Sequence, residues 1–193
     1  MMFLKALLLF VLPTCVLWAG GELLNSIRLA DAQDAPAYTA RAEKRGPCSL
    51  GEELPVNMRL CGYTPADVAQ QWGKNSDKTE RQFLLYDLAF PLFYGGALCL
   101  ALWLAWSDLG RPFAPAWLLA PVLLGMLADW VENLIHLDQL GRYVQHGPTA
   151  LSSGWIQLAS WATSLKLALV CTGFLLLAVL SLWLMRRALM ERS

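Results

Sequence analysis

The sequence predicts an all-α integral membrane protein with four transmembrane helices. Apolar runs at residues 3–19, 83–106, 117–137 and 155–185 fill most of the chain, and about 20 apolar residues suffice to span a bilayer. Of the 193 residues, 56% are hydrophobic and 16% are charged, a composition typical of membrane proteins. Tryptophan prefers the headgroup level, and six tryptophans lie near the ends of these runs: Trp18, Trp103, Trp106, Trp117, Trp155 and Trp183.

Residues 1–20 are predicted to form the first transmembrane helix. Lys5 followed by an apolar run is also typical of a secretory signal peptide. However, Leu17 stands at the −3 position before Ala19, where signal peptidase requires a small side chain, so the sequence favours an uncleaved anchor. Pro13 predicts a kink near the middle of this helix.

Residues 21–82 are predicted to form an extracytoplasmic loop that contains short helices. Cys48 and Cys61 lie thirteen positions apart among prolines and glycines, a spacing that suits a disulfide closing a loop. Two free thiols are the alternative. A disulfide would place this loop outside the reducing cytoplasm.

Two helix starts are predicted near the end of that loop. Thr64, Pro65 and Asp67 supply a capping hydroxyl, a proline for the first turn and an acid that reaches back to the backbone. They predict a short helix that ends near Trp72. Ser76 predicts a second start, of a helix that continues directly into the second apolar run.

The basic residues near the ends of the runs predict the orientation. One side of the membrane receives Lys5, Arg111, Arg186, Arg187 and Arg192, and the short loop at 138–154 on the other side has Arg142. Because the more basic side of a membrane protein faces the cytoplasm, both termini are predicted to be cytoplasmic. Residues 83–193 then form a three-helix membrane core.

Polar residues form a narrow stripe in the third run. At about 100° per residue, Asp129, Glu132, Asn133 and His136 fall on one face of a helix, together with Gly125. Charged groups are costly in hydrocarbon, so we expect this face to point toward protein or trapped water rather than lipid.

The second and fourth runs carry polar residues that match this stripe. Asp87, Pro91 and Tyr94 share one helical face, and Pro91 frees a backbone carbonyl. Thr163 and Lys166 lie one turn apart in the fourth run. At about 1.5 Å per residue, the charged side chains lie roughly 6 to 16 Å below the outer boundary. They can therefore meet in one cavity that is open to the outside.

The predicted site is an outward-facing polar pocket inside the membrane. Its candidate ligand-binding residues are Asp87, Tyr94, Asp129, Glu132, Asn133, His136, Thr163 and Lys166. Three carboxylates against one ammonium leave excess negative charge, which proteins relieve by protonation, by binding a cation or by admitting water. The favoured function is binding or transport of a small amphipathic ligand or of protons.

Two other functions fit the same residues. In a structural or assembly subunit, the buried charges form an ion-pair network that sets helix register, and another membrane protein is the partner. In an intramembrane enzyme acting on a lipid, Glu132 or Asp129 is the general base, Lys166 stabilises charge and His136 carries protons. We predict no cofactor and no metal site. Zero net charge without a basic tract gives no footing for nucleic-acid binding.

Four segments carry a resemblance to a known family. Residues 63–68, 86–94, 129–133 and 162–166, with the motifs Phe-Pro-x-x-Tyr, Asp-x-x-Glu-Asn and Thr-x-x-Lys, resemble a family of small, uncharacterised four-span bacterial membrane proteins. The resemblance implies a four-span topology and a location in the bacterial inner (plasma) membrane, without an activity. An acid shortly before a Phe-Pro stretch is also distantly similar to the sterol-isomerase-like EXPERA proteins, which would imply a sterol-type ligand.

Overall fold

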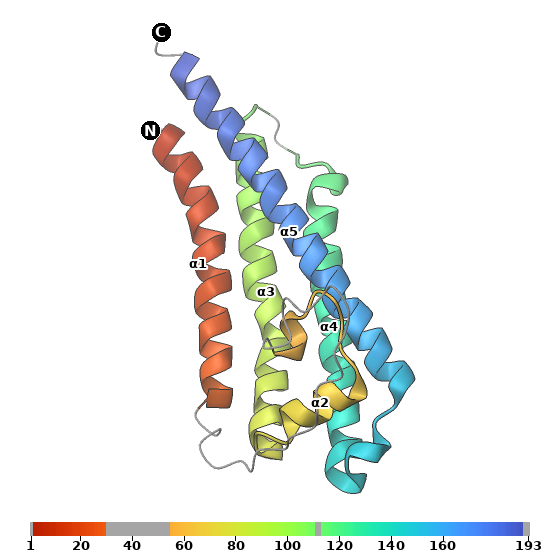
Figure 1. Cartoon of the computed structure of the whole chain (residues 1–193). Helices are drawn as coiled ribbons and strands as arrows, with labels where there is room; N and C mark the ends of the chain where they lie inside the picture. The colour runs from red at the N-terminus through yellow and green to blue at the C-terminus, as the bar shows by residue number, and fades with distance from the viewer. Residues whose placement is uncertain (1, 30–54, 111–112, 191–193) are drawn as a thin grey trace.

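The computed structural model describes residues 2–29, 55–110 and 113–190, and these ranges are helical with short connections and no strand. Four long helices run alongside one another (Figure 1): α1 (Met2–Leu29), α3 (Asp77–Ser107), α4 (Ala116–His146) and α5 (Ser153–Met190). The short segments η1 (Val56–Met58), α2 (Pro65–Trp72) and η2 (Pro148–Ala150) lie toward the end of the bundle opposite the two termini.

All four long helices are long and apolar enough to cross a membrane, which supports a multi-pass membrane protein. This confirms the predicted all-α class in the described ranges, and the number of helices able to span agrees with the four that the sequence predicts. Two helices extend well beyond the predicted runs. The helix α4 continues to His146, so part of the loop predicted at 138–154 is helical.

The first helix departs most from its predicted bounds. We expected it to end near Ala19, before the Gly-Gly pair, but α1 continues to Leu29. Gly20 allows close packing here instead of ending the helix, because a Cβ at this position would collide with the ring of Phe90 on α3. Beyond it, Leu24 and Arg28 are buried, and this packing stabilises the additional turns.

The predicted helix starts at Thr64 and Ser76 are confirmed. The Thr64 side chain accepts from the backbone N–H of Asp67, and the Asp67 carboxylate accepts from the backbone N–H of Thr64 at 2.6 Å. This capping box begins α2, which ends at Trp72 as expected. The Ser76 hydroxyl likewise accepts from the backbone N–H of Thr79 and caps α3.

Glycines set how closely the long helices approach one another. At Gly95 on α3, an added Cβ would collide with Met126 on α4. At Gly173 on α5, it would lie 2.8 Å from Val122 and 3.0 Å from Leu98. Small residues at such positions allow close helix packing inside a membrane. Gly96, by contrast, has open space around it.

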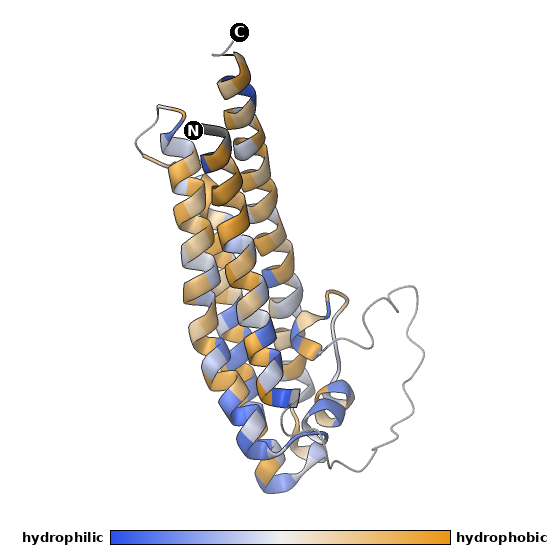
Figure 2. Cartoon of the chain, turned by 90° about the vertical axis from the view of Figure 1, so that its left-hand side faces the viewer, coloured by the Kyte–Doolittle hydropathy of each residue, from blue (hydrophilic) through white to orange (hydrophobic). Residues whose placement is uncertain are grey.

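The bundle divides into two halves with different interiors. The apolar half, at the end with the termini, is built on the buried residues Ala6, Leu9, Leu98, Ala101, Leu102, Ala105, Leu118, Val122, Met126, Leu177, Leu180 and Leu184. The polar half, toward α2, holds the buried side chains of Arg28, Glu80, Asp87, Asp129, Glu132, Asn133, His136, Gln139, Ser160, Thr163 and Lys166. Figure 2 shows the same division in the hydropathy of the ribbon.

Three residues behind the sequence predictions lie outside the described residues. Cys48 is one of them, so the predicted disulfide between Cys48 and Cys61 stays a prediction. Arg111 and Arg192, which contributed to the predicted orientation, are the other two.

Candidate functional site

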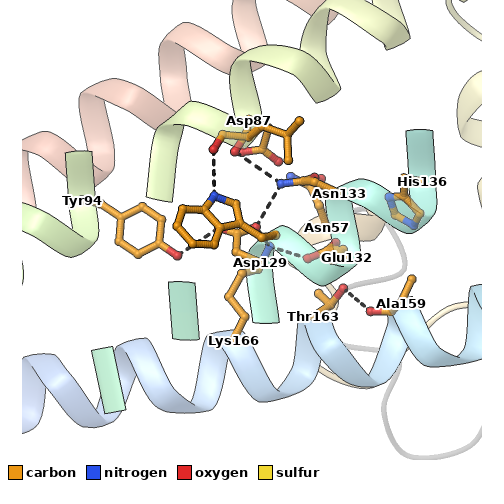
Figure 3. Close-up of polar contacts among 12 residues, drawn as sticks. Asn57, Asp87, Tyr94, Asp129, Glu132, Asn133, His136, Ala159, Thr163 and Lys166 are labelled. Atoms are coloured by element: carbon orange, nitrogen blue, oxygen red, sulfur yellow. Dashed lines mark hydrogen bonds and ion pairs between the residues drawn. The ribbon is translucent and has the colours of Figure 1, made fainter. Parts of the chain in front are cut away.

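Lys166 on α5 joins two carboxylates of α4 in the middle of the polar half (Figure 3). Its Nζ donates to Oε2 of Glu132 at 2.6 Å and to Oδ1 of Asp129 at 2.9 Å. Glu132 is fully buried, and Lys166 and Asp129 are nearly so. The sequence predicted this meeting, because the helical faces and depths of the three side chains agree.

Asp129 is the centre of a wider set of contacts. Its Oδ2 accepts from the hydroxyl of Tyr94 on α3 at 2.9 Å, and its Oδ1 also accepts from the amide of Asn133 at 3.3 Å. The carboxylate therefore ties α4 to both α3 and α5. Low polarity around these groups strengthens each contact and makes each unpartnered polar atom costly.

Pro91 explains a second contact of Asn133. Proline has no N–H, so the carbonyl of Asp87, one turn earlier in α3, loses its helical partner. The amide of Asn133 donates to this carbonyl at 3.3 Å. Nearby, the indole N–H of Trp130 donates to the carbonyl of Leu88 at 2.9 Å, which gives this mid-span tryptophan a polar contact. Both bonds fix α4 against the proline turn of α3.

Three acceptor atoms in this region have no partner. They are Oδ2 of Asp87, Oε1 of Glu132 and Oδ1 of Asn133, all buried and without a hydrogen bond in the described part of the chain. Asp87 is 4% exposed. An unpartnered buried acceptor costs about 1–3 kcal/mol, more when it is charged. This part of the site therefore lacks hydrogen-bond donors.

His136 and Thr163 belong to a neighbouring set organised by Tyr63. The Tyr63 hydroxyl lies 3.0 Å from Nε2 of His136 and 3.2 Å from Oγ1 of Thr163. Its backbone N–H donates to the hydroxyl of Ser160 at 3.0 Å. Burial and the Glu132 carboxylate raise the pKa of Tyr63 well above its ordinary value, so the phenol stays protonated. The segment before α2 therefore packs against the α4 and α5 pair at the end of the bundle away from the termini.

Sequence reasoning did not assign Tyr63 to the site. Tyr63 precedes a helix cap in a region predicted as loop, and no periodicity links it to the spans. A signal was nevertheless present, because a large aromatic residue directly before an N-cap is often packed against the structure that follows.

A second buried ion pair was also missed. Arg28 on α1 donates from Nε and Nη2 to the two carboxylate oxygens of Glu80 on α3, at 3.0 and 2.8 Å. Its guanidinium lies 3.4 Å from the ring centre of Phe83, and Asn75 also donates to Glu80. Both charged residues fall in the region 21–82, which was predicted to be an extracytoplasmic loop with short helices, and no contact between them was predicted.

A cavity of about 220 Å³ lies between α1, α3 and α5 beside these groups. It is lined by Leu17, Gly21, Leu24, Asn25, Arg28, Pro55, Asn57, Met58, Phe83, Asp87, Phe90, Tyr94, Asp129, Lys166, Leu167, Val170, Cys171 and Phe174. Most of this wall is apolar, and the charged groups occupy part of it. Such a mixture is typical of small-molecule sites.

The structure divides the predicted site residues between the cavity and its surroundings. Asp87, Tyr94, Asp129 and Lys166 line the cavity. The other four, Glu132, Asn133, His136 and Thr163, lie behind this wall and contact the first set or Tyr63. Sequence analysis also missed the contribution of α1, because the residues from Gly21 onward were assigned to the loop.

The buried charges in the described residues do not balance. Four carboxylates, Glu80, Asp87, Asp129 and Glu132, face two cations, Arg28 and Lys166. No group of three or more His, Cys, Asp or Glu side chains in the described ranges is arranged to hold a metal ion. With all groups ionised, the region carries an excess of negative charge in a place of low polarity.

Comparisons of this chain with protein-family models, with curated proteins and with solved structures found no match.

Proposed function

We propose that this protein binds or transports a small amphipathic ligand, which occupies the cavity between α1, α3 and α5. The observation that carries this proposal is the mixed wall of the cavity. Asp87, Tyr94, Asp129 and Lys166 form its polar part, and side chains such as Leu24, Phe90 and Phe174 form its apolar part. A ligand with a polar head and a short hydrocarbon tail matches both surfaces.

The cost of the polar half supports a binding role. Buried ion pairs are weak evidence for stability, because hydrophobic side chains of similar volume often stabilise a core as well or better. The apolar half already holds the same four helices together by apolar packing. Charges and unpartnered acceptors retained beside a cavity are better explained by a ligand than by the need to fold.

The experiment blocks the cavity and leaves the polar residues in place. Gly21 lines the cavity, and an added Cβ there meets nothing within 4 Å, so Gly21 is a suitable position for a bulky Trp that occupies the space. Gly96→Trp is the matched control, because Gly96 also has open space but does not line the cavity. Small molecules extracted from the purified proteins are then compared by mass spectrometry.

A small amphiphile that copurifies with the wild type and with Gly96→Trp, but not with Gly21→Trp, is the expected result. A wild type without a copurifying amphiphile, or one retained equally by Gly21→Trp, would contradict the proposal.

The second candidate is a structural subunit whose charges set helix register. The observation in its favour is the contact of Lys166 with two carboxylates, at 2.6 and 2.9 Å, which links α5 to α4. If Glu132→Gln and Lys166→Met each destabilise the fold, the double variant restores it, and no ligand copurifies, this function replaces binding.

We further propose the orientation that the sequence predicts, with both termini cytoplasmic in a bacterial inner membrane and a disulfide between Cys48 and Cys61 outside. The end of the bundle that holds both termini carries basic residues, with Lys5 near the start of α1 and Arg187 in the last turn of α5. Green fluorescent protein fused after Ser193 should fluoresce, because it folds in the cytoplasm but not after export in unfolded form. A dark but full-length fusion would reverse the orientation.

A further inference from the structure

We infer that the ligand carries a protonated amine on a hydrocarbon tail, and that it reaches the cavity sideways from the bilayer between α1 and α5. This inference rests on the proposed binding function and names the class of ligand.

The wall of the cavity includes a residue with an unpartnered hydrogen-bond acceptor. Asp87 lines the cavity, is 4% exposed, and has one carboxylate oxygen without a partner in the described residues. Asn133 beside it is already engaged, since its amide donates to the carbonyl of Asp87 and to Asp129. A head group that donates hydrogen bonds would complete this wall, whereas one that only accepts would add to the unsatisfied acceptors.

The buried charges favour a positively charged head group. Four buried carboxylates face two buried cations in the described residues, so a monovalent cation reduces the imbalance and an anion increases it. Lys166 is not expected to bind an anionic ligand either, because its ammonium is already paired with the carboxylates of Glu132 and Asp129. Among donor-bearing head groups, the protonated amine satisfies both the acceptors and the charge.

The exposure of the lining residues indicates the route into the cavity. The charged wall, Asp87, Asp129 and Lys166, is buried. On the facing edges of α1 and α5, Gly21 and Leu167 are half-buried and Cys171 is exposed. These edges belong to two candidate membrane spans, so the cavity opens toward lipid. A ligand dissolved in the bilayer therefore has a direct route to the site.

The size of the cavity limits the ligand. Its volume of about 220 Å³ corresponds to roughly seven water volumes at ~30 Å³ each. A short alkyl amine, such as one with an eight-carbon tail, is a suitable probe, with part of its tail in the opening between the helices.

The experiment uses photo-crosslinking probes that share one short alkyl chain bearing a diazirine and differ in the head group: amine, hydroxyl or carboxylate. The intact protein is placed in nanodiscs of neutral lipid, because an anionic surface would itself concentrate the amine. For each probe, the number of crosslinks to α1 and α5 residues that line the cavity is divided by the number of crosslinks to the lipid-facing surface around Gly96. This ratio removes differences in how the probes partition into lipid.

The amine probe is expected to exceed the hydroxyl and carboxylate probes in this ratio by about tenfold or more, the effect of one charge-assisted hydrogen bond. Asp87→Asn should remove this preference, and Asp77→Asn, at an exposed position of the same helix, should keep it. Gly21→Trp should lower the ratio for every probe, and Gly96→Trp should not.

The outcomes separate the two proposals. Cavity crosslinks that are absent for every probe, or unchanged in Gly21→Trp, overturn the proposed function together with this inference. Cavity crosslinks that are equal for the three heads, or that still favour the amine in Asp87→Asn, overturn the amine inference alone. Labelling of Cys171 by a charged, membrane-impermeant thiol reagent as fast as by a lipid-soluble one would overturn the route through the bilayer.

Discussion

The two halves of this bundle hold the same four helices by different means. In the apolar half, residues such as Leu98, Val122 and Leu177 are fully buried and fit around Gly173. In the polar half, helices are joined by Lys166, by the pair of Arg28 and Glu80, and by the phenol of Tyr63. The cavity lies on this second side.

This difference teaches that polar contacts are not needed to assemble the helices. Apolar packing with close glycine contacts suffices at one end, as it does in many membrane proteins. The polar end leaves acceptors unpaired and space unfilled. The two halves should therefore respond differently to substitution.

Lys166→Met should produce the largest loss of stability. The variant leaves Glu132 and Asp129 buried without their cation. Breaking a buried pair in this way costs about 3–5 kcal/mol. The measurement is the unfolding temperature in mild detergent, beside Lys74→Met, which removes an exposed lysine as a control.

Glu132→Gln added to Lys166→Met should recover part of that loss, because one of the two stranded charges is then gone. A Lys166→Met protein that unfolds at the temperature of the wild type would show that the ion pairs do not contribute to the fold. The charges of the polar half would then have to be explained by function alone.

Gly173→Val should give the next largest effect, this time in the apolar half. A Cβ there would lie 2.8 Å from the Val122 side chain and 3.0 Å from the Leu98 side chain, so these side chains or α5 itself must shift. Overpacking of this kind costs about 1–3 kcal/mol. Gly96→Val is the matched control, since that position is open. Equal unfolding temperatures for the two variants would mean that the apolar half is loosely packed.

Tyr63→Phe should be milder, because it removes one hydroxyl and keeps the ring. His136 and Thr163 lose a hydrogen-bond partner, at about 1–2 kcal/mol. Tyr86→Phe is the control, since Tyr86 is 60% exposed. The measurement is the unfolding temperature of each variant in detergent. Equal values would mean that the hydroxyl of Tyr63 does not stabilise the fold.

Alkaline pH should distinguish Tyr63 from a simple packing residue. Its folded-state pKa is raised by burial, so the folded state keeps a proton that the unfolded chain loses above about pH 10. The stability that this proton provides is complete below that pH and falls as pH rises further. The wild type should therefore lose stability in alkali more steeply than Tyr63→Phe, and parallel curves would contradict the assignment.

The sequence predicted the parts of this structure that follow from helical periodicity. The meeting of Asp129 and Glu132 with Lys166 follows from shared faces and depths in adjacent spans. Pro91 likewise predicted a freed backbone carbonyl, but that the amide of Asn133 donates to it was not predicted. The spacing of residues within a regular helix indicates which groups share a face and not which partner each one finds.

Contacts made by the region before the second span could not be predicted in the same way. Tyr63 reaches His136 and Thr163 from outside any long helix, so no period places it. Arg28 was assigned to a loop because the first apolar run ends at Ala19. The helix α1 instead continues past Gly20, which packs closely against Phe90 of α3, and the cavity wall formed by the later turns of α1 was therefore missed.

Lys5→Met should have the smallest effect, although it breaks an ion pair between the same two helices that Arg28 and Glu80 join. Lys5 contacts Asp108 at 2.6 Å, but the two side chains are 50% and 23% exposed. Water and salt screen such a pair, so its loss costs less than about 1 kcal/mol and becomes undetectable at high salt. Arg28→Met, at the other end of the α1 and α3 contact, should cost several times more and change little with salt, because Glu80 is then stranded with no exposed surface. Unfolding temperatures at low and high salt measure both variants, and equal losses would mean that α1 is held by its two ends alike.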